Sequence, residues 1–292
     1  MPATPQHYVV FSLLIFLYQP MSIPLQLEFA ALTDTGLLRP HNEDAIALSP
    51  DFGLVILADG MGGYNAGEVA SNIAITTVRQ VMETELQAIA AEPSVDAPVH
   101  MSALLSHAVN EANTAILTAA LLEPDYSGMG TTLVVALFHH RMLTLAHVGD
   151  SRGYRQRDGQ LEQLTRDHSH LQEQIDAGLV SLDEAWFSPH RNLITRAVGI
   201  EDAIEVEVHD FAVLPGDLYL LCSDGLSDML TAQHIEAILQ ESAEDLQLAV
   251  ANLLASANEQ GGRDNISVIL VHVQDHDTKK DSLIGRLLGW IK

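Results

Sequence analysis

The stretch from Leu54 to Gly63 reads LVILADGMGG and joins an apolar run directly to an acidic residue. Its first five residues, LVILA, are rich in Val, Ile and Leu and predict a buried β-strand. Asp59 follows that strand at once, and Gly60 comes next. A strand end holds such a carboxylate rigidly, while the adjacent glycine leaves room for a ligand. The stretch therefore predicts a ligand site at the end of a buried strand.

Outward from this stretch, buried strands alternate with long amphipathic helices. Apolar runs predict strands over 132–138, 142–148, 218–222 and 266–273, and a first strand within 22–34. Apolar residues with a 3.6-residue period predict helices over 66–86, 99–122, 231–240 and 243–260. The pattern indicates a mixed α/β layered domain, and the sequence contains no internal repeat or low-complexity tract.

Further acidic residues share the setting of Asp59. Asp224 follows LYLLCS and precedes Gly225, Asp150 ends MLTLAHVG, Asp264 stands just before Ile266, and Glu43 and Asp44 lie in the turn RPHNEDA. If these strand ends converge, the carboxylates need cations to stay ionised. Oxygen donors favour Mg²⁺ or Mn²⁺ over zinc, and two such ions about 3.5–4 Å apart can hold a phosphoryl group. The alternative for each Asp-Gly alone is a strand-ending turn.

Composition limits the class of partner and the compartment. The chain has 292 residues, 47% of them hydrophobic, and a mean hydropathy of +0.13, which is enough to build a substantial core. Lys and Arg total 14 against 39 for Asp and Glu, and the net charge of -25 argues against a nucleic-acid partner. Cys222 is the sole cysteine, so no intrachain disulfide or thiolate zinc site can form. We expect a cytoplasmic protein, with Cys222 in the core.

The two ends of the sequence differ from the body over 21–274. Residues 1–20 are interpreted as an apolar extension outside the fold. The run over 8–18 is shorter than the roughly 20 residues of a membrane span, and it lacks the flanks of a secretory signal. Residues 275–292 form a charged linker and a short amphipathic tail. The tail indicates contact with a membrane surface or a partner, or else packing against its own domain.

Motifs along the body occur in the order of a known enzyme family. They are Asp34-Thr35-Gly36, Arg39, Asn42-Glu43-Asp44-Ala45, Ala58-Asp59-Gly60-Met61-Gly62-Gly63, Gly67-Glu68-Val69-Ala70-Ser71, Gly130-Thr131-Thr132, Val148-Gly149-Asp150-Ser151-Arg152, Leu164-Thr165-Arg166-Asp167-His168-Ser169, Ser223-Asp224-Gly225-Leu226 and Gly262-Arg263-Asp264-Asn265-Ile266-Ser267. Over about residues 26–273 the chain resembles the metal-dependent PPM family of Ser/Thr protein phosphatases, the protein phosphatase 2C type, in its short bacterial form.

The resemblance implies an α+β fold, a four-layer αββα sandwich of two antiparallel sheets flanked by helices. It also implies a centre of two Mn²⁺ or Mg²⁺ ions, with a third ion left open. In the implied assignment, Asp59 bridges the two ions, the Gly60 carbonyl binds one of them, and Asp224 and Asp264 hold the other. Glu43 and Asp44 engage metal-bound waters, and Asp150 with Asp224 forms the third site. Arg39 binds the substrate phosphate. The planar guanidinium of Arg39 suits two phosphate oxygens better than a lysine would.

The implied reaction is attack of a metal-activated water on phosphoserine or phosphothreonine, without a phosphoenzyme. The implied substrates are phosphorylated proteins, targets of a bacterial Ser/Thr kinase. The alternative is a catalytically weak binding or regulatory member of the same fold. Loss of metal-site acids would mark that alternative, and none of the implied acids is missing.

The sequence departs from the family at the general acid. Many relatives carry His directly after Asp-Gly or after Asp-Gly-Met-Gly-Gly, whereas this chain has Met61 and Tyr64 there. A water on a metal, Tyr64 or His41 remain as alternatives. Residues 168–196 resemble the flap that borders the family's active site. Within the flap, Trp186 and Phe187 either contact substrate or pack a short helix against the body.

Overall fold

The computed structural model describes residues 25–63, 65–91, 100–181, 184 and 193–274. Residues 1–20, the segment 275–292, Tyr64, Trp186 and Phe187 lie outside this described part, so the predictions made for them stay predictions. Within the described part, no helix has both the length and the apolar character that crossing a membrane requires.

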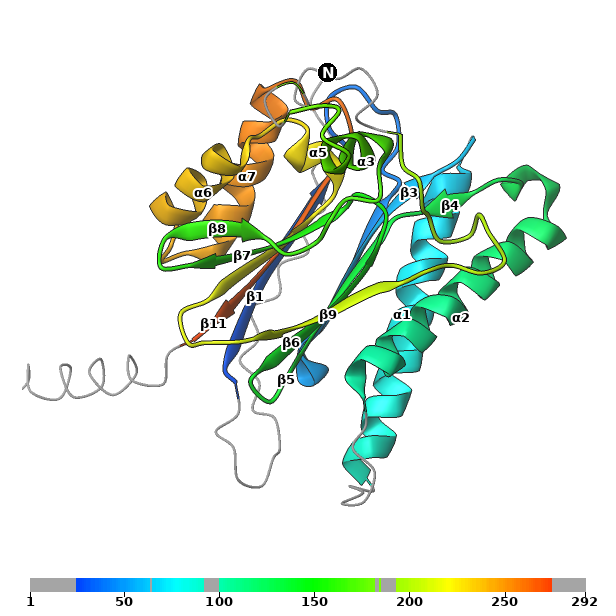
Figure 1. Ribbon diagram of the computed structural model, residues 1–292, viewed down its shortest axis with the longest axis horizontal. Helices are drawn as coiled ribbons and strands as arrows, with labels where there is room; N and C mark the ends of the chain where they lie inside the picture. Colours follow the sequence, from blue (N-terminus) through cyan, green and yellow to red (C-terminus); the bar gives the residue numbers. More distant parts are fainter. Residues whose placement is uncertain (1–24, 64, 92–99, 182–183, 185–192, 275–292) are drawn as a thin grey trace, which may run out of the picture.

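Two antiparallel sheets form the centre of the molecule (Figure 1). The five-stranded sheet has the order β1 (Leu27–Asp34), β11 (Ile266–Val273), β10 (Leu218–Cys222), β7 (Arg152–Arg157) and β8 (Gln160–Gln163). The six-stranded sheet has the order β2 (Asp44–Ser49), β3 (Leu54–Met61), β5 (Leu133–His139), β6 (Met142–Val148) and β9 (Glu207–Ala212), with β4 (Gly130–Thr131) beside β3.

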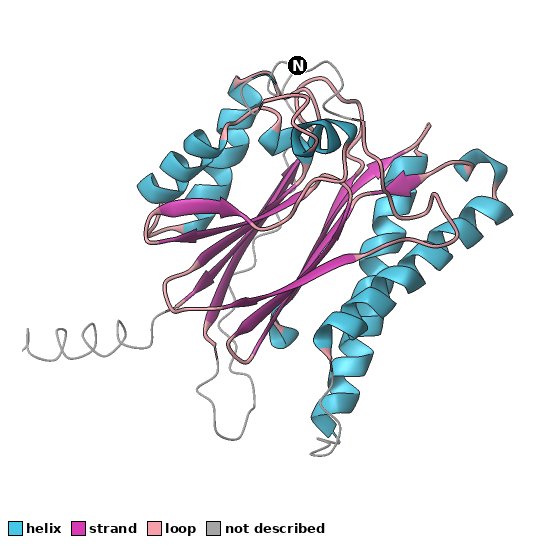
Figure 2. Ribbon diagram, in the orientation of Figure 1, coloured by secondary structure: helices cyan, strands magenta, loops and turns pink. Residues whose placement is uncertain are grey.

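Helices cover the outer face of each sheet, which completes four layers (Figure 2). Over the six-stranded sheet lie α1 (Ala66–Ala91) and α2 (Met101–Leu122), and over the five-stranded sheet lie α6 (Ala232–Glu241) and α7 (Leu246–Glu259). The shorter elements are α3 (His170–Asp176), α5 (Asp224–Ser227), η1 (Pro50–Phe52) and η2 (Pro124–Tyr126). The αββα sandwich implied by the motifs is confirmed.

The apolar run that opened the sequence analysis lies between two separate cores. Along β3, Leu54, Ile56 and Ala58 pack in the core under α1 and α2. Val55 and Leu57 alternate with them and pack in the core between the two sheets. Because both faces of β3 are buried, its sequence is a continuous apolar run instead of an alternating one.

Each predicted strand and helix is observed, with shifts at the ends, whereas β2, β7, β8, β9 and α3 were not among the predicted elements. The helix predicted from 243 begins at Leu246, because Asp245 acts as its N-cap and its carboxylate accepts the Leu248 N–H at 3.0 Å. In the flap, an isolated bridge pairs Ser169 with Ile194, so the two ends of residues 168–196 meet at the body.

Candidate metal centre

Six acidic residues gather at one end of the sandwich, where the strands that carry them end or begin. We call them the acidic cluster: Glu43, Asp44, Asp59, Asp150, Asp224 and Asp264. Asp44 and Asp59 are directly paired in the β2·β3 ladder, which places both side chains on the same face. Asp224 opens α5, which lies over the upper end of the sandwich in Figure 1. The fold thus brings together every acidic residue that the sequence singled out.

Burial and mutual repulsion make this cluster costly to ionise without cations. Burial raises the pKa of Asp44 to about 6, although hydrogen bonds from serine hydroxyls oppose the shift. The pKa of Asp59 lies well above its usual range because of burial and then because of the neighbouring aspartates, Asp44 first among them. Burial, followed by the charge of Asp150, raises the pKa of Asp224 in the same way. Burial also raises the pKa of Asp150 to about 7.

The donor atoms of the cluster fit a hard divalent cation. The Asp44 Oδ2 atom accepts a hydrogen bond from the Ser223 hydroxyl at 2.7 Å. Its other oxygen, Oδ1, is buried and has no hydrogen-bond partner among the described residues. A buried carboxylate oxygen without a donor is expensive in an apolar protein interior, and a cation removes that cost. The cluster supplies oxygens alone, which is the donor set that Mg²⁺ and Mn²⁺ prefer.

Arg39 stands at the exposed rim of the acidic cluster. Its guanidinium donates to the Asp264 carboxylate at 2.5 Å, and about half of its side chain (47%) is exposed. Burial raises the pKa of the nearby Glu43 carboxyl, and the positive charges of Arg39 and His41 act against that rise. The structure therefore places Arg39 within reach of the cluster, with its contact made to one of the implied ligands.

Asn265 is a site residue whose role the sequence did not reveal. Its side-chain oxygen accepts the Glu43 N–H at 2.8 Å. Its amide donates to the backbone carbonyls of Thr35 and His41, each at 2.9 Å. One buried amide thus fixes the loop that carries Arg39 and the acids beside it. The available signal was an Asn between Asp264 and a buried strand, although spacing alone does not show what such an amide holds.

His168 holds the turn that carries Asp150. Gly149 has a φ of 106°, a conformation that L side chains rarely adopt. His168 fixes it twice: the His168 N–H donates to the Gly149 carbonyl at 2.9 Å, and the Gly149 N–H donates to Nδ1 of His168 at 3.2 Å. Because Nδ1 accepts that bond, the proton lies on Nε2, which donates to Glu207 at 3.2 Å.

His147, His168 and Glu207 also have the composition of a metal site, since their candidate ligand atoms lie within 4.8 Å of one another. Both nitrogens of His168 are engaged as described above, and Nε2 of His147 contacts the Arg166 carbonyl at 2.8 Å. The two imidazole rings are stacked, with centroids 4.7 Å apart and planes inclined by 20°. We therefore interpret the group as a hydrogen-bonded support.

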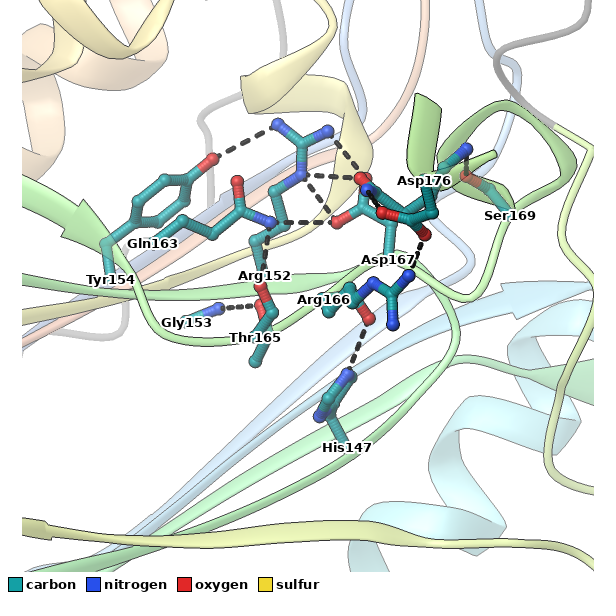
Figure 3. Close-up of polar contacts among 11 residues, drawn as sticks. His147, Arg152, Gly153, Tyr154, Gln163, Thr165, Arg166, Asp167, Ser169 and Asp176 are labelled. Atoms are coloured by element: carbon teal, nitrogen blue, oxygen red, sulfur yellow. Dashed lines mark hydrogen bonds and ion pairs between the residues drawn. The ribbon is translucent and has the colours of Figure 1, made fainter. Parts of the chain in front are cut away.

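A second network fixes the chain between β8 and the flap (Figure 3). Arg152 makes a bidentate contact with Asp167, at 2.9 Å from Nε and 2.6 Å from Nη2. Gln163 donates to the same carboxylate at 3.0 Å, and Arg152 also reaches the Tyr154 hydroxyl at 3.2 Å. Asp167 directly precedes His168, whose contacts with Gly149 hold the turn at Asp150. The network therefore supports that turn through His168.

Comparisons with known proteins agree with this geometry. A model of the protein phosphatase 2C family matches residues 40–264, which include the whole acidic cluster. Serine/threonine protein phosphatase PstP of Mycobacterium tuberculosis is 40% identical over 257 residues, 87% of this chain and 46% of that protein, so the chain spans about half its length. Serine/threonine phosphatase stp of Listeria monocytogenes is 37% identical over 242 residues, 82% of this chain and 93% of that protein. The PstP catalytic domain with two manganese ions has a TM-score of 0.75 at 38% identity, covering 86% of this chain and 100% of that one.

Proposed function

Because this chain belongs to the protein phosphatase 2C family, we propose that it is a metal-dependent phosphatase that hydrolyses phosphoserine and phosphothreonine in proteins. The observation that carries the proposal is the acidic cluster, whose raised pKa values and buried Asp44 oxygen call for cations at the end of the sandwich. Phosphate monoesters are substrates that such a cluster, once it holds cations, can bind and hydrolyse.

In the proposed site, the carboxylates of Asp59, Asp224 and Asp264 and the Gly60 carbonyl would hold two Mn²⁺ or Mg²⁺ ions. Bound ions would polarise the phosphoryl group and lower the pKa of a coordinated water that attacks phosphorus. Glu43 and Asp44 orient water molecules at the site.

The buried network behind these groups keeps them in place before substrate arrives. Ser223 holds Asp44, and Thr131 holds the Asp59 backbone carbonyl through a 2.8 Å bond from its hydroxyl.

Arg39 binds the substrate phosphate in this proposal. In the structure its guanidinium contacts Asp264, and it is exposed enough to turn toward an entering phosphate. Its fork then donates to two phosphate oxygens and neutralises charge that develops as the ester bond breaks. Because cations at the site would engage the Asp264 carboxylate, they also free Arg39 for this contact.

The leaving serine or threonine oxygen needs a proton, and His41 is one candidate among the described side chains. His41 lies beside Glu43, close enough to oppose the rise in that carboxyl's pKa. Met61 has no proton to donate, and Tyr64 lies outside the described residues. A water on a metal is the other alternative.

The proposal extends to the setting of the enzyme. Its substrates are phosphoproteins, and a bacterial Ser/Thr kinase supplies them, because hydrolysis of a protein phosphate needs a prior phosphorylation. We place the enzyme in the cytoplasm, where the single, buried Cys222 suits a reducing compartment. We also propose that the C-terminal tail, residues 282–292, contacts a membrane surface.

Hydrolysis of phosphoserine and phosphothreonine peptides, measured by phosphate release, tests the function. We expect turnover with Mn²⁺ or Mg²⁺, none with EDTA, and a loss of at least about a hundredfold in Asp59→Asn. Asp51→Asn is the matched control, because Asp51 is an exposed aspartate in η1 at the opposite end of β2. Equal rates in EDTA and Mn²⁺, or normal turnover in Asp59→Asn, would overturn the metal-dependent reaction at this cluster. No turnover with either ion would overturn the phosphatase in favour of a binding member of the fold.

A further inference from the structure

A groove opens directly beside the acidic cluster, on the side of the flap's return segment. Its volume is about 520 Å³, within the range of ligand sites. It is lined by Met61, Ile194, Thr195, Arg196, Ala197, Ile200, Glu201, Ala203, Ile204 and Glu205. The roles assigned to the catalytic residues do not use this groove.

The position of Met61 connects the groove to the site of reaction. Asp59 and Met61 are two residues apart on β3, so their side chains project from the same face, about 6.6 Å apart along the strand. An extended peptide repeats with the same spacing. In a substrate peptide that runs along β3 with its phosphorylated residue at Asp59, a side chain within two positions of that residue therefore reaches Met61.

Hydrogen bonds to the neighbouring backbone keep the apolar side chain of Ile200 exposed in the groove. Ile200 is 46% exposed, yet both of its neighbours are fixed by the buried Asn113. The Gly199 N–H donates to Oδ1 of Asn113 at 2.6 Å, and Nδ2 of Asn113 donates to the Glu201 carbonyl at 2.9 Å. The side chains of Ile200 and Met61 both lie over Gly130 and form the apolar floor of the groove. An exposed isoleucine held by a buried amide indicates a preformed contact surface.

The rim of the groove is acidic. Its charged lining residues are Arg196, Glu201 and Glu205. Arg196 pairs with Glu205 at 3.1 Å, so one arginine faces two glutamates and the rim carries net negative charge. The whole chain, these residues included, carries a net charge of -25, which repels acidic peptides and attracts basic ones.

We propose, as an extension of the proposed function on which this inference rests, that the groove binds a lysine or arginine side chain of the phosphoprotein substrate, within two positions of the phosphorylated residue. The aliphatic stem packs on Met61 and Ile200, and the cationic end meets Glu201. A purely apolar side chain uses the floor alone, and an acidic one is repelled by the rim. The site therefore selects basic sequences around the phosphate.

The test uses phosphopeptides that differ at one position, with lysine, norleucine or alanine placed one or two residues from phosphothreonine. Norleucine keeps the stem without the charge, and alanine removes both. In kcat/KM with Mn²⁺, we expect lysine to exceed norleucine by about two- to fivefold. Norleucine should exceed alanine by about tenfold.

Two variants separate the parts of the groove. Glu201→Gln should bring the lysine-to-norleucine ratio to about one and leave the norleucine-to-alanine ratio in place. Ile200→Ser should reduce the norleucine-to-alanine ratio and keep the charge preference. The matched controls are Glu244→Gln and Leu248→Ser, since Glu244 is exposed and Leu248 is 50% exposed on the far side of the fold.

The outcomes distinguish this inference from the proposed function. Equal rates on the three peptides, or a preference for an acidic neighbour, would overturn the groove while leaving a phosphatase. An effect of Glu244→Gln as large as that of Glu201→Gln would assign the preference to overall charge and also overturn the groove. Failure to hydrolyse any of the peptides with Mn²⁺ would overturn the proposed function itself, and the groove with it.

Discussion

At the scale of single residues, the ion pair between Arg39 and Asp264 shows how one side chain can serve two partners. The pair joins positions 225 residues apart, and it lies at the exposed rim of the cluster. Its free energy is small at such exposure, so it does not prevent Arg39 from moving to a phosphate.

We predict that Arg39→Ala raises KM for phosphopeptides by roughly tenfold to a hundredfold, the effect of losing hydrogen bonds to a charged group. Any further fall in kcat would reflect a contact that tightens in the transition state. Steady-state kinetics measure both constants, and calorimetry checks that Mn²⁺ still binds. An unchanged KM would remove Arg39 from the phosphate site.

The position of Asp150 depends on His168, which fixes the preceding residue Gly149, and substitutions at both positions test this dependence. We predict that Asp150→Ala leaves two ions bound and lowers kcat with little change in KM, because Asp150 belongs to the implied third site. His168→Leu should reproduce that pattern, since it removes the acceptor for the Gly149 N–H.

The conservative variant His168→Asn should restore kcat, because its side-chain oxygen can occupy the place of Nδ1. Calorimetric titration with Mn²⁺ gives a readout besides activity, since the weaker third binding step should vanish in His168→Leu and return in His168→Asn. Equal losses in both variants would indicate general damage to the fold. Normal kcat in His168→Leu would show that His168 does not position Asp150.

At the scale of elements, the strand-to-helix connection from β3 to α1 is closely packed at one glycine and open at another. A Cβ on Gly60 would lie 2.1 Å from the Gly67 carbonyl oxygen, whereas a Cβ on Gly63 would meet nothing within 4 Å. The first contact involves backbone, which cannot move without displacing the start of α1.

We therefore predict that Gly60→Ala lowers the free energy of unfolding by about 1–3 kcal/mol or more and weakens Mn²⁺ binding. Gly63→Ala should change stability by less than about 0.5 kcal/mol. Urea unfolding and calorimetry measure the two effects. Similar stability of the two variants would show that the β3-to-α1 connection is less rigid than its packing indicates.

The turn into β10 depends on a buried carboxylate. Asp217 is 1% exposed and accepts hydrogen bonds from Arg157 at 2.6 and 2.7 Å, from the Leu214 N–H at 2.8 Å and from the Tyr219 hydroxyl at 2.9 Å. Burial alone would raise the pKa of Asp217, but these bonds outweigh it and the pKa is lowered. Because the pKa of Asp217 is lower in the folded than in the unfolded protein, its stabilisation of the fold is present above the unfolded pKa of about 3.9 and is lost as pH falls through the folded pKa.

We predict that Asp217→Asn lowers the free energy of unfolding by about 1–3 kcal/mol at pH 7, because it removes the charge that pairs with Arg157, a side chain that is itself 27% exposed. The difference from the unsubstituted protein should shrink as the pH is lowered below about 4. Urea unfolding across that pH range measures it, with Asp51→Asn as the exposed control. A difference that stays constant with pH would contradict the assignment of the lowered pKa.

At the scale of the whole molecule, the acidic cluster links metal binding to stability. Ions that bind only the folded state stabilise it by roughly 2.7 kcal/mol per site at a hundredfold excess over Kd. For a domain of this size that corresponds to a rise in Tm of about 5–10 °C per site.

We predict such a rise with Mn²⁺, and its loss in Asp59→Asn. In EDTA, Asp59→Asn should melt at or above the unsubstituted protein, because it removes a buried charge repelled by its neighbours. Thermal melts with and without Mn²⁺ measure both effects. An equal rise in the variant would place the stabilising ions elsewhere.

The local sequence determined the elements and the residues of the cluster. Apolar runs such as LVILA, rich in Val, Ile and Leu, favour inner strands, and acids placed directly before or after such runs then lie at strand ends, whatever the order of strands in the sheets. The motifs then implied the family, the αββα sandwich and the cluster. Helix ends were less certain from periodicity, because a single N-cap such as Asp245 decides where a helix starts.

Tertiary structure alone decided which residues meet across the chain. The pairing of Asp44 with Asp59 depends on strand register, which a shift of one residue would destroy. The amide of Asn265 on the Arg39 loop, the hold of His168 on Gly149, and the groove formed where Asn113 fixes Ile200 all join segments distant in sequence. Periodicity and spacing report only local preferences, whereas these contacts exist because two packed sheets bring remote loops to one end of the molecule.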